Sequence, residues 1–594
     1  MRYNATPLLT LAALLILVAL PALFVLLQAI FPQLAAGSLA HAFGAVPALW
    51  RDPQVPTLLG GTLQTGLGVA AACALLGVPL GALRGLFAVP LARFWDVLVL
   101  IPFLTPPYIA GLSWMLALQR RGYLEQLTGL RLDALLFSRT GMVLVMTLNI
   151  FPVVYFAVSR AMAAGGHRLA DVARVHGAGP WRAFYRVTLP LALPAICAGL
   201  LLAFTLAIEE YGVPAALGMR AGAPVLTVGI EQRLADWPID LTSASLLSLM
   251  LVALALAAYG IQRVLSGGRD VATTGGKPVA IASRPLGVWR WPTLLLFGLV
   301  TGLAVAAPMA AMLATAFSST VSGGLTAANL TLRHFSTLFA QHGEAADALA
   351  TSLGLALGSA LLTGLLGFMV AWRVISARGR ATACIDALSL LPAALPGVVV
   401  GVGLILAWNR RFWPITPYDS WVILLLAYSC LLLPYPVRYT AAALRQLGAS
   451  LEPAARVHGA SATRALRHIV LPLVFPALLA SMLMVFAIAS RELVTSLLLS
   501  PPGVQTVSVF IWRQFEQGSV GDGMAMASIA MLLSIMVMLT ALALLQRPRR
   551  QAGDGAARLS IPTQGNAMRA ATGRFPGRTV PPVRGADYPT DGRK

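Results

Sequence analysis

One polar stretch occurs twice in this chain, and the duplication constrains the architecture more than any other feature. The first copy, residues 169–196, reads LADVARVHGAGPWRAFYRVTLPLALPAI, and the second, residues 451–478, reads LEPAARVHGASATRALRHIVLPLVFPAL. The shared RVHGA core begins at Arg174 in one copy and at Arg456 in the other, an offset of 282 residues. A repeat of this kind predicts two equivalent halves within one chain.

The segments between these stretches are strongly apolar. Hydrophobic residues make up 58% of the chain and charged residues 11%, whereas soluble proteins carry about 25% charged residues. Apolar runs near the length of a membrane-spanning helix recur throughout. We therefore predict an all-α polytopic membrane protein of about twelve transmembrane helices in two parallel six-helix repeats. The spans are expected near residues 8–30, 57–83, 94–118, 141–163, 191–213, 241–264, 292–317, 346–372, 383–407, 421–440, 473–498 and 523–546.

Five regions follow from this pattern. The charge-free first span exceeds the usual length of a signal-peptide core, so it is interpreted as a retained helix, with a cleaved signal as the alternative. The tail is rich in Gly, Pro and Arg and is expected to be disordered and cytoplasmic. The regions are a first helix and outer loop (1–56), a first transmembrane domain (57–265), a linker with the seventh helix and an outer loop (266–345), a second transmembrane domain (346–546) and the basic tail (547–594).

The net charge of +21 does not indicate nucleic-acid binding, because the basic residues gather in loops and in the tail. Lys and Arg accumulate in the loops on the cytoplasmic side of membrane proteins. The distribution of Lys and Arg among the loops therefore predicts that both termini and both copies of the repeated stretch face the cytoplasm. The helices are expected to be surrounded by the lipid bilayer.

No motif for an enzyme is visible. The sequence has no GxxxxGK[ST] motif, and its Gly276-Lys277 pair is followed by proline, so it carries no ATPase signature. It has no catalytic constellation and no CxxC pair, and neither a disulfide nor a metal site is expected. The four cysteines are interpreted as buried apolar residues: Cys73, Cys197, Cys384 and Cys430.

A few charged residues fall near predicted spans, where they are costly and are functional candidates. Glu209, Glu210 and Tyr211 close the predicted fifth helix, and Arg491 and Glu492 lie within the predicted eleventh. The 282-residue offset makes Glu210 and Glu492 equivalent. One interpretation is a translocation pathway for a cation with oxygen ligands. The other is a structural ion pair or gate between Arg491 and Glu210.

Prolines are expected to interrupt two helices at matching positions, 102–107 and 392–396. The freed backbone carbonyls would either line a cavity or mark kinks that bind no ligand.

Each repeated stretch is predicted to form a helix, a tight turn and a second helix. Gly177-Ala178 and Gly459-Ala460 break the first helix of each copy, and Ser450 is a candidate N-cap in the second. His176 and His458 are interpreted as packing residues of a docking surface rather than metal ligands. An ordinary basic loop at the membrane surface is the alternative for either copy alone, but duplication favours a docking device.

Both stretches resemble the EAA loop of type I permease subunits of ATP-binding-cassette (ABC) importers. In that family the loop forms a coupling helix on a separate ATPase subunit. The resemblance implies two fused permease halves in a bacterial inner membrane, two ATPase copies that bind ATP and Mg, a periplasmic binding protein and no cofactor on this chain. The Glu of the motif is replaced by Asp171 and by Pro453, with Glu452 one position early. The implied coupling residues are Asp171, Ala173, Arg174, Gly177, Ala178, Pro190, Glu452, Ala455, Arg456, Gly459, Ala460 and Pro472.

Among fused permeases, the segments EEYGVPAALGMRAGAPVLTVGI (209–230) and SRELVTSLLLSPPGVQTVSVFIW (490–512) are most similar to iron(III) importers. The resemblance implies import of ferric iron by alternating access. Similar fused permeases serve thiamine and phosphonate importers, so these or another small solute stay as alternatives. A secondary transporter and a polytopic membrane enzyme are alternatives from other classes.

Overall fold

The computed structural model describes residues 5–266, 284–340, 343–377, 379–410, 413–447, 451–537 and 540, and these are almost entirely helical. The strands of the described part, β1 (Phe87–Ala88) and β2 (Arg284–Pro285), form one parallel pair. The predicted all-α class is confirmed. Ser450, most of the linker and the tail 547–594 lie outside the described residues.

The first half contains α-helices and short 3-10 or π segments, the latter labelled η: α1 (Ala5–Leu14), η1 (Leu15–Ala19), α2 (Leu20–Ile30), η2 (Leu34–Ala36), α3 (Val46–Arg51), α4 (Gln54–Leu86), α5 (Ala92–Leu104), α6 (Pro107–Leu118), α7 (Tyr123–Thr128), α8 (Asp133–Leu136), α9 (Arg139–Val175), α10 (Pro180–Ala183), η3 (Phe184–Thr188), α11 (Leu189–Glu209), η4 (Pro214–Gly218), α12 (Leu226–Ala235) and α13 (Leu241–Ser266).

The second half contains η5 (Gly287–Trp289), α14 (Arg290–Thr301), η6 (Gly302–Ala306), α15 (Ala307–Ala316), η7 (Val321–Gly323), η8 (Ala327–Asn329), α16 (Arg333–Ala340), α17 (Glu344–Ser376), α18 (Arg380–Leu390), η9 (Leu391–Ala394), α19 (Gly397–Trp408), α20 (Val422–Leu432), α21 (Pro434–Leu447), α22 (Leu451–Val457), α23 (Ala462–Ala465), η10 (Leu466–Val470), α24 (Leu471–Ala489), α25 (Val494–Leu499) and α26 (Val507–Glu516).

Within the described residues, nine helices are long and apolar enough to cross a membrane, and three bent helix pairs bring the number of spans to as many as twelve. This number agrees with the predicted twelve. The nine are Leu8–Ile30, Gln54–Leu86, Arg139–Ala164, Pro180–Glu209, Leu241–Leu265, Gly287–Ala316, Glu344–Ser376, Leu466–Ala489 and Val520–Val537. The bent pairs are Ala92–Leu104 with Pro107–Thr128, Arg380–Ala394 with Gly397–Trp408, and Val422–Leu432 with Pro434–Leu447.

The predicted fourth span, 141–163, agrees with the observed span Arg139–Ala164, and its helix continues as α9 to Val175, so the first part of the first repeated stretch extends a spanning helix. One predicted helix end is wrong. The predicted eleventh helix, 473–498, ends as α24 at Ala489, and a separate short helix, α25, follows. Arg491 and Glu492 therefore lie between helices rather than within one.

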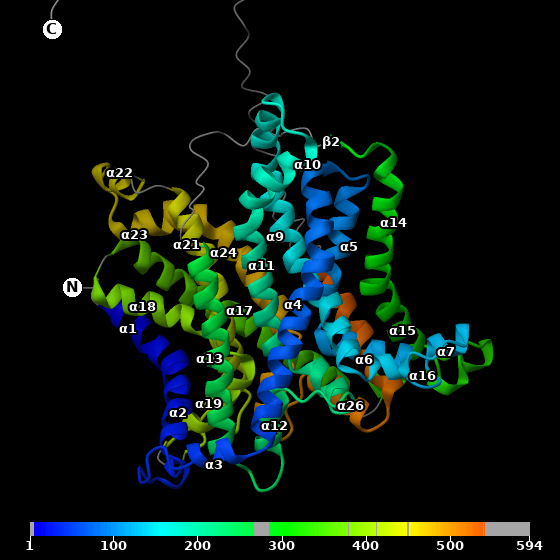
Figure 1. Cartoon of the computed structure of the whole chain (residues 1–594). Coiled ribbons are helices and arrows are strands. Elements are labelled where there is room, and N and C mark those ends of the chain that lie inside the picture. The colour runs from blue at the N-terminus through cyan, green and yellow to red at the C-terminus, as the bar shows by residue number, and fades with distance from the viewer. Residues whose placement is uncertain are drawn as a thin grey trace, which may run out of the picture. The chain divides into compact units, whose positions relative to one another are not determined.

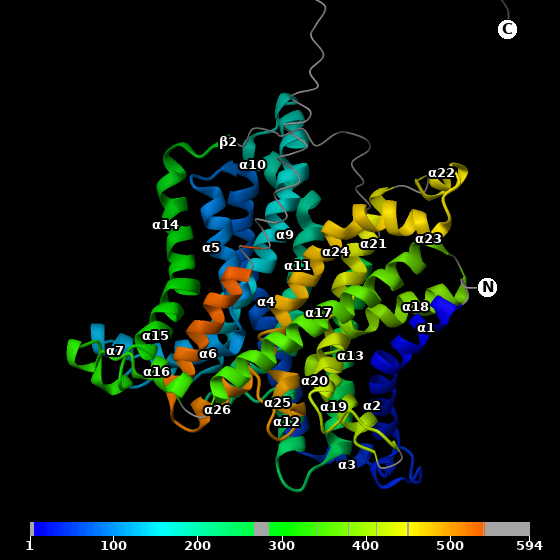
Figure 2. The same cartoon turned by 180° about the vertical axis from the view of Figure 1, so that it is seen from behind.

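The two halves are built alike. In the first half α4 packs against α9 and α11, and in the second α17 packs against α21 and α24. Figures 1 and 2 show these two groups of helices side by side.

The first helix of each half, however, packs on the other half. Leu14 and Val18 of the first span are fully buried in a cluster with Ala356 and Leu404 of the second half. In the converse arrangement, Phe297 of α14 is buried among core residues of the first half. This exchange ties the halves together through apolar burial.

Glycines allow α4 to approach α9 closely. A Cβ atom on Gly81 would lie 2.7 Å from the carbonyl oxygen of Tyr155 and 2.9 Å from Cβ of Val158. The backbones are in contact here, as is common where small residues line helix interfaces in membranes.

We expect Gly81→Val to destabilise the protein by about 1–3 kcal/mol, because an added side chain forces these backbones apart. Gly60→Val on the same helix is the matched control, since no atom lies within 4 Å of a Cβ there. Thermal unfolding in detergent measures the difference, and equal midpoints for the two variants would contradict the packing argument.

Candidate functional site

Two helices are broken at the prolines identified in the sequence. Between α5 and α6 the chain bends by 94°, and between η9 and α19 it bends by 115°. In both places a proline directly precedes the second helix, Pro106 in the first half and Pro396 in the second. The predicted interruption of both helices is confirmed, and it frees carbonyl groups at the end of each first segment.

The carbonyls freed in the first half are bonded by side chains. Asn149 donates through Nδ2 to the carbonyl oxygens of Pro102 (2.6 Å) and Thr105 (3.2 Å). Arg491 of the second half donates through Nη1 to the carbonyl oxygens of Phe103 (3.0 Å) and Leu104. The guanidinium group thus caps a broken helix of the opposite half and satisfies backbone acceptors that the break leaves free.

The repeat-equivalent glutamates cap helices in the same way. The backbone N–H of Gly212 donates to Oε1 of Glu210 (2.9 Å), directly after α11 ends. The backbone N–H of Thr495 donates to Oε1 of Glu492 (3.2 Å) at the start of α25. A carboxylate at a helix N-terminus satisfies free N–H groups and interacts favourably with the helix dipole. This capping explains why the chain leaves the helix before Glu492.

At the position before each glutamate the halves differ in charge, since Glu209 corresponds to Arg491. Glu210, Arg491 and Glu492 lie close enough to interact electrostatically. No ion pair within 4.0 Å involves Arg491 in the part of the chain that the structure describes. The contacts of Arg491 are therefore the carbonyls, with the carboxylates at longer range.

A cavity of about 400 Å³ lies between the halves beside these residues. It is lined by Glu209 from α11 and by Glu492, together with residues of η9, α20 and α21. The Oε1 atom of Glu209 is buried and has no hydrogen-bond partner among the described residues. A buried polar atom without a hydrogen-bond partner costs free energy, which makes Glu209 a candidate for a functional role.

Five further polar residues line this cavity and were not expected from the sequence: Thr205, Tyr428, Tyr435, Arg438 and Tyr439. Tyr428 is 2% exposed and its hydroxyl is hydrogen-bonded to Ser496. Three of these residues could have been found from the sequence, because the PYPVRY segment places an arginine and two tyrosines at the end of a predicted apolar span. Tyr211, predicted beside the glutamates, instead packs its ring 6.1 Å from that of Trp512.

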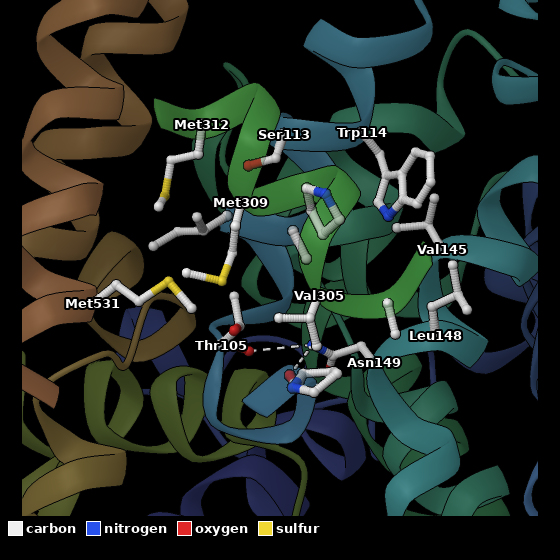
Figure 3. A pocket seen from close by; sticks show the side chains of 15 residues that line it. Thr105, Ser113, Trp114, Val145, Leu148, Asn149, Val305, Met309, Met312 and Met531 are labelled. Carbon is white, nitrogen blue, oxygen red and sulfur yellow. Dashed lines mark hydrogen bonds between the residues drawn. The ribbon is translucent and has the colours of Figure 1, made fainter. Parts of the chain in front are cut away.

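A second pocket lies near the first broken helix and is much smaller. Figure 3 shows Asn149 bonded to the chain at Thr105, with the side chains of Met309, Met312 and Met531 on the opposite wall. Its volume is about 20 Å³, which is room for about one water molecule. Met309 and Met312 come from α15, and Met531 comes from the last span.

The two repeated stretches form nearly identical turns. In the first, Gly177 has φ +87°, its N–H donates to the Arg174 carbonyl, and the N–H of Ala178 donates to the Ala173 carbonyl (both 3.0 Å). This pattern is a Schellman motif, which ends a helix with glycine in the left-handed region.

The second stretch repeats the motif at the offset of 282 residues. Gly459 has φ +84°, with the N–H of Gly459 bonded to Arg456 and that of Ala460 bonded to Ala455 (both 3.0 Å). Pro190 and Pro472 lie inside the continuous helices Pro180–Glu209 and Leu466–Ala489, just after the π segments η3 and η10. Figures 1 and 2 place α10 and the α22–α23 pair at the same end of the helices.

The acidic positions of the two stretches differ. Asp171 is exposed and forms an ion pair with Arg284 of β2. The side chain of Glu452 lies outside the described residues, so its contacts are not compared. His176 and His458 are both exposed beside the turn glycines.

The fold and these two loops define a polytopic inner-membrane transport component with duplicated halves. The chain belongs to the family of binding-protein-dependent transport system inner membrane components, whose model matches residues 75–270 and 363–551. The two matched segments agree with the predicted duplication, and family membership argues against the alternatives of a secondary transporter and a membrane enzyme.

Curated relatives are similar over much of the chain. A ferric transport system permease protein of Actinobacillus pleuropneumoniae is 26% identical over 74% of this chain and 64% of its own length. A putative ferric transport system permease protein of Haemophilus influenzae is 28% identical over 65% of this chain and 61% of its own length. The chain thus spans less than two thirds of these two relatives. A putative 2-aminoethylphosphonate transport system permease protein of Salmonella typhimurium is 28% identical over 39% of this chain and 86% of its own length.

Proposed function

We propose that this chain is the permease subunit of an ABC importer, with both permease halves fused. The observation that carries the proposal is the pair of Schellman turns, centred on Gly177 and Gly459, at the same end of the two halves. Each loop docks one copy of a separate cytoplasmic ATPase, which binds ATP and Mg. The chain itself catalyses no reaction, and both of its termini face the cytoplasm.

Substrate arrives from a periplasmic binding protein and passes between the halves by alternating access. The cavity beside Glu209 and Glu492 is the proposed pathway, because both halves contribute to its wall. Movement of the halves changes the surroundings of both carboxylates, so affinity differs between the outward and inward states. Such a difference in affinity is what a conformational cycle needs to release its substrate.

Ferric iron is the proposed substrate. Two curated relatives carry ferric transport in their names, and carboxylate and phenol oxygens suit a hard cation. Thiamine, phosphonate or another small solute is the alternative, and one relative is named for a phosphonate.

Uptake of radioactive iron into cells with and without the chain tests this proposal, with the binding protein and the ATPase present. We expect uptake to require the chain and to be unaffected by excess thiamine or phosphonate. If the ATPase copurifies with the chain but uptake does not depend on iron, the permease function is supported and ferric iron is rejected as the substrate. If the ATPase does not copurify and iron uptake does not require the chain, the permease function is rejected as well.

Glu209→Gln should lower iron uptake roughly tenfold, because losing a carboxylate contact to the cation costs about 1.4 kcal/mol or more. The substitution keeps the shape of the side chain and replaces one carboxylate oxygen with an amide nitrogen. Glu344→Gln, at an exposed position on α17, is the matched control and should transport normally. Concentration-dependent uptake measures the effect, and unchanged kinetics for Glu209→Gln would exclude this carboxylate from the pathway.

A further inference from the structure

A second large cavity, of about 520 Å³, lies beside the first repeated stretch and away from the proposed pathway. Its wall is almost entirely apolar and comes from three segments: the end of α4, the stretch from α9 to η3, and β2. The apolar lining includes Pro79, Leu83, Leu86, Phe87, Ala170 and Phe184. A cavity of this size is sufficient for a small ligand or one hydrocarbon chain.

Two arginines are the charged residues that line this cavity, Arg174 and Arg284. Arg284 is fixed at two points, since its backbone pairs with Phe87 in the β1–β2 bridge and its side chain pairs with Asp171. Arg174 lies in the last turn of α9, and no ion pair within 4.0 Å involves it in the described part of the chain. Because Asp171 offsets the charge of Arg284, the three side chains leave one net positive charge at the edge of an apolar space.

The surroundings identify this edge as a membrane boundary. The cavity is lined by the end of α4 and by η3, which belong to the membrane-spanning helices Gln54–Leu86 and Pro180–Glu209. Figure 1 shows both helices reaching the end that carries the loops. Trp181 is 72% exposed and stacks on Tyr185, with ring centroids 6.0 Å apart. Exposed aromatic rings of this kind gather at the level of lipid headgroups.

We propose that this cavity binds one acyl chain of an anionic phospholipid, with the lipid phosphate held by Arg174 and Arg284. The apolar wall accommodates the chain, and the two guanidinium groups meet the phosphate, a geometry that arginine serves well. A water-soluble anion would gain nothing from the apolar wall. A phospholipid without net charge carries the same phosphate, but the positive group in its headgroup repels the two arginines. We therefore expect it to bind more weakly than an anionic lipid.

The bound lipid has a consequence for the first loop. Arg174, Trp181 and Phe184 belong to the repeated stretch, so a lipid in the cavity supports the loop from beneath. Arg284 comes from the segment that joins the two halves, and this support is therefore specific to the first loop. The inference concerns lipid binding and stands whether or not the substrate is iron.

Native mass spectrometry of the purified full-length chain tests the proposal, with phosphatidylglycerol and phosphatidylcholine offered in equal amounts. We expect retention of phosphatidylglycerol, and a loss of about tenfold or more in the double variant Arg174→Gln with Arg284→Gln, since each basic residue near a membrane surface contributes about a factor of five. Arg182→Gln is the matched control, because this exposed arginine lies on the same loop and does not line the cavity.

A second variant, Leu83→Trp, fills the cavity and leaves both arginines in place. It should lose the lipid while its thermal unfolding shows that the protein is folded. Equal retention of the two lipids by the wild type, or wild-type retention of phosphatidylglycerol by both variants, would overturn the proposal. Displacement of the lipid by the added ATPase would also overturn it, since the cavity would then be a protein-docking surface.

Discussion

Replacing Arg491 with alanine should reduce uptake about a hundredfold and destabilise the protein by about 3 kcal/mol or more, because charged hydrogen bonds are lost and buried acceptors stay unpaired. The guanidinium group of Arg491 bonds the carbonyls of Phe103 and Leu104, which the break between α5 and α6 leaves free. It also supplies the positive charge near Glu210 and Glu492.

Arg491→Lys should recover part of the function, since lysine keeps the charge but bonds from a single ammonium group. Arg513→Ala is the matched control, because this arginine lies in the same half on an exposed face of α26. Uptake and thermal unfolding are measured on the same preparations. Wild-type values of both for Arg491→Ala would show that the contact between the halves is dispensable.

Replacing Gly177 or Gly459 with tryptophan should abolish uptake, with a fall of at least about tenfold, while the protein still inserts into the membrane. Both glycines have a positive φ that other residues adopt at a cost of about 1–2 kcal/mol. No atom lies within 4 Å of a Cβ built at either position, so the new side chain meets nothing within the described chain. The expected loss therefore comes from the altered turn and from the obstructed approach of the ATPase.

Gly37→Trp separates these effects from general strain. Gly37 has φ +82° and equally open surroundings, but it lies between η2 and α3, away from both loops. This variant should transport normally. Asparagine at Gly177 should be tolerated better than tryptophan, since it adopts the left-handed region more readily. Normal uptake in both loop variants would refute the docking function of the loops.

The two loops need not respond equally to these changes. Asp171 is paired with Arg284, and the first loop continues the spanning helix α9. In the second half, residues 448–450, which join α21 to α22, lie outside the described part of the chain.

The prediction that a glycine ends the helix in each loop is confirmed. It was possible because the Schellman motif is local and is specified by a few neighbouring residues.

The position of Arg491 and Glu492 could not be read from the sequence. Both lie in an apolar segment whose composition predicts an uninterrupted helix, yet α24 ends at Ala489. The helix ends there because Glu492 caps α25 and Arg491 bonds to carbonyls of the other half. These partners are distant in the chain, and local propensity is overridden by tertiary bonds of this kind.

The sequence by itself determined the all-helical membrane class, the duplication, the proline breaks and the glycine turns. Each of these depends on local composition or on spacing within one segment, and such patterns are visible without a structure. The tertiary structure alone decided which groups from the two halves meet. It packs the first helix of each half on the other half, and it brings Glu209, Tyr435 and Arg438 to one cavity. These contacts join segments hundreds of residues apart, because the shapes of folded helices and the demand for bonded polar groups in the bilayer select them.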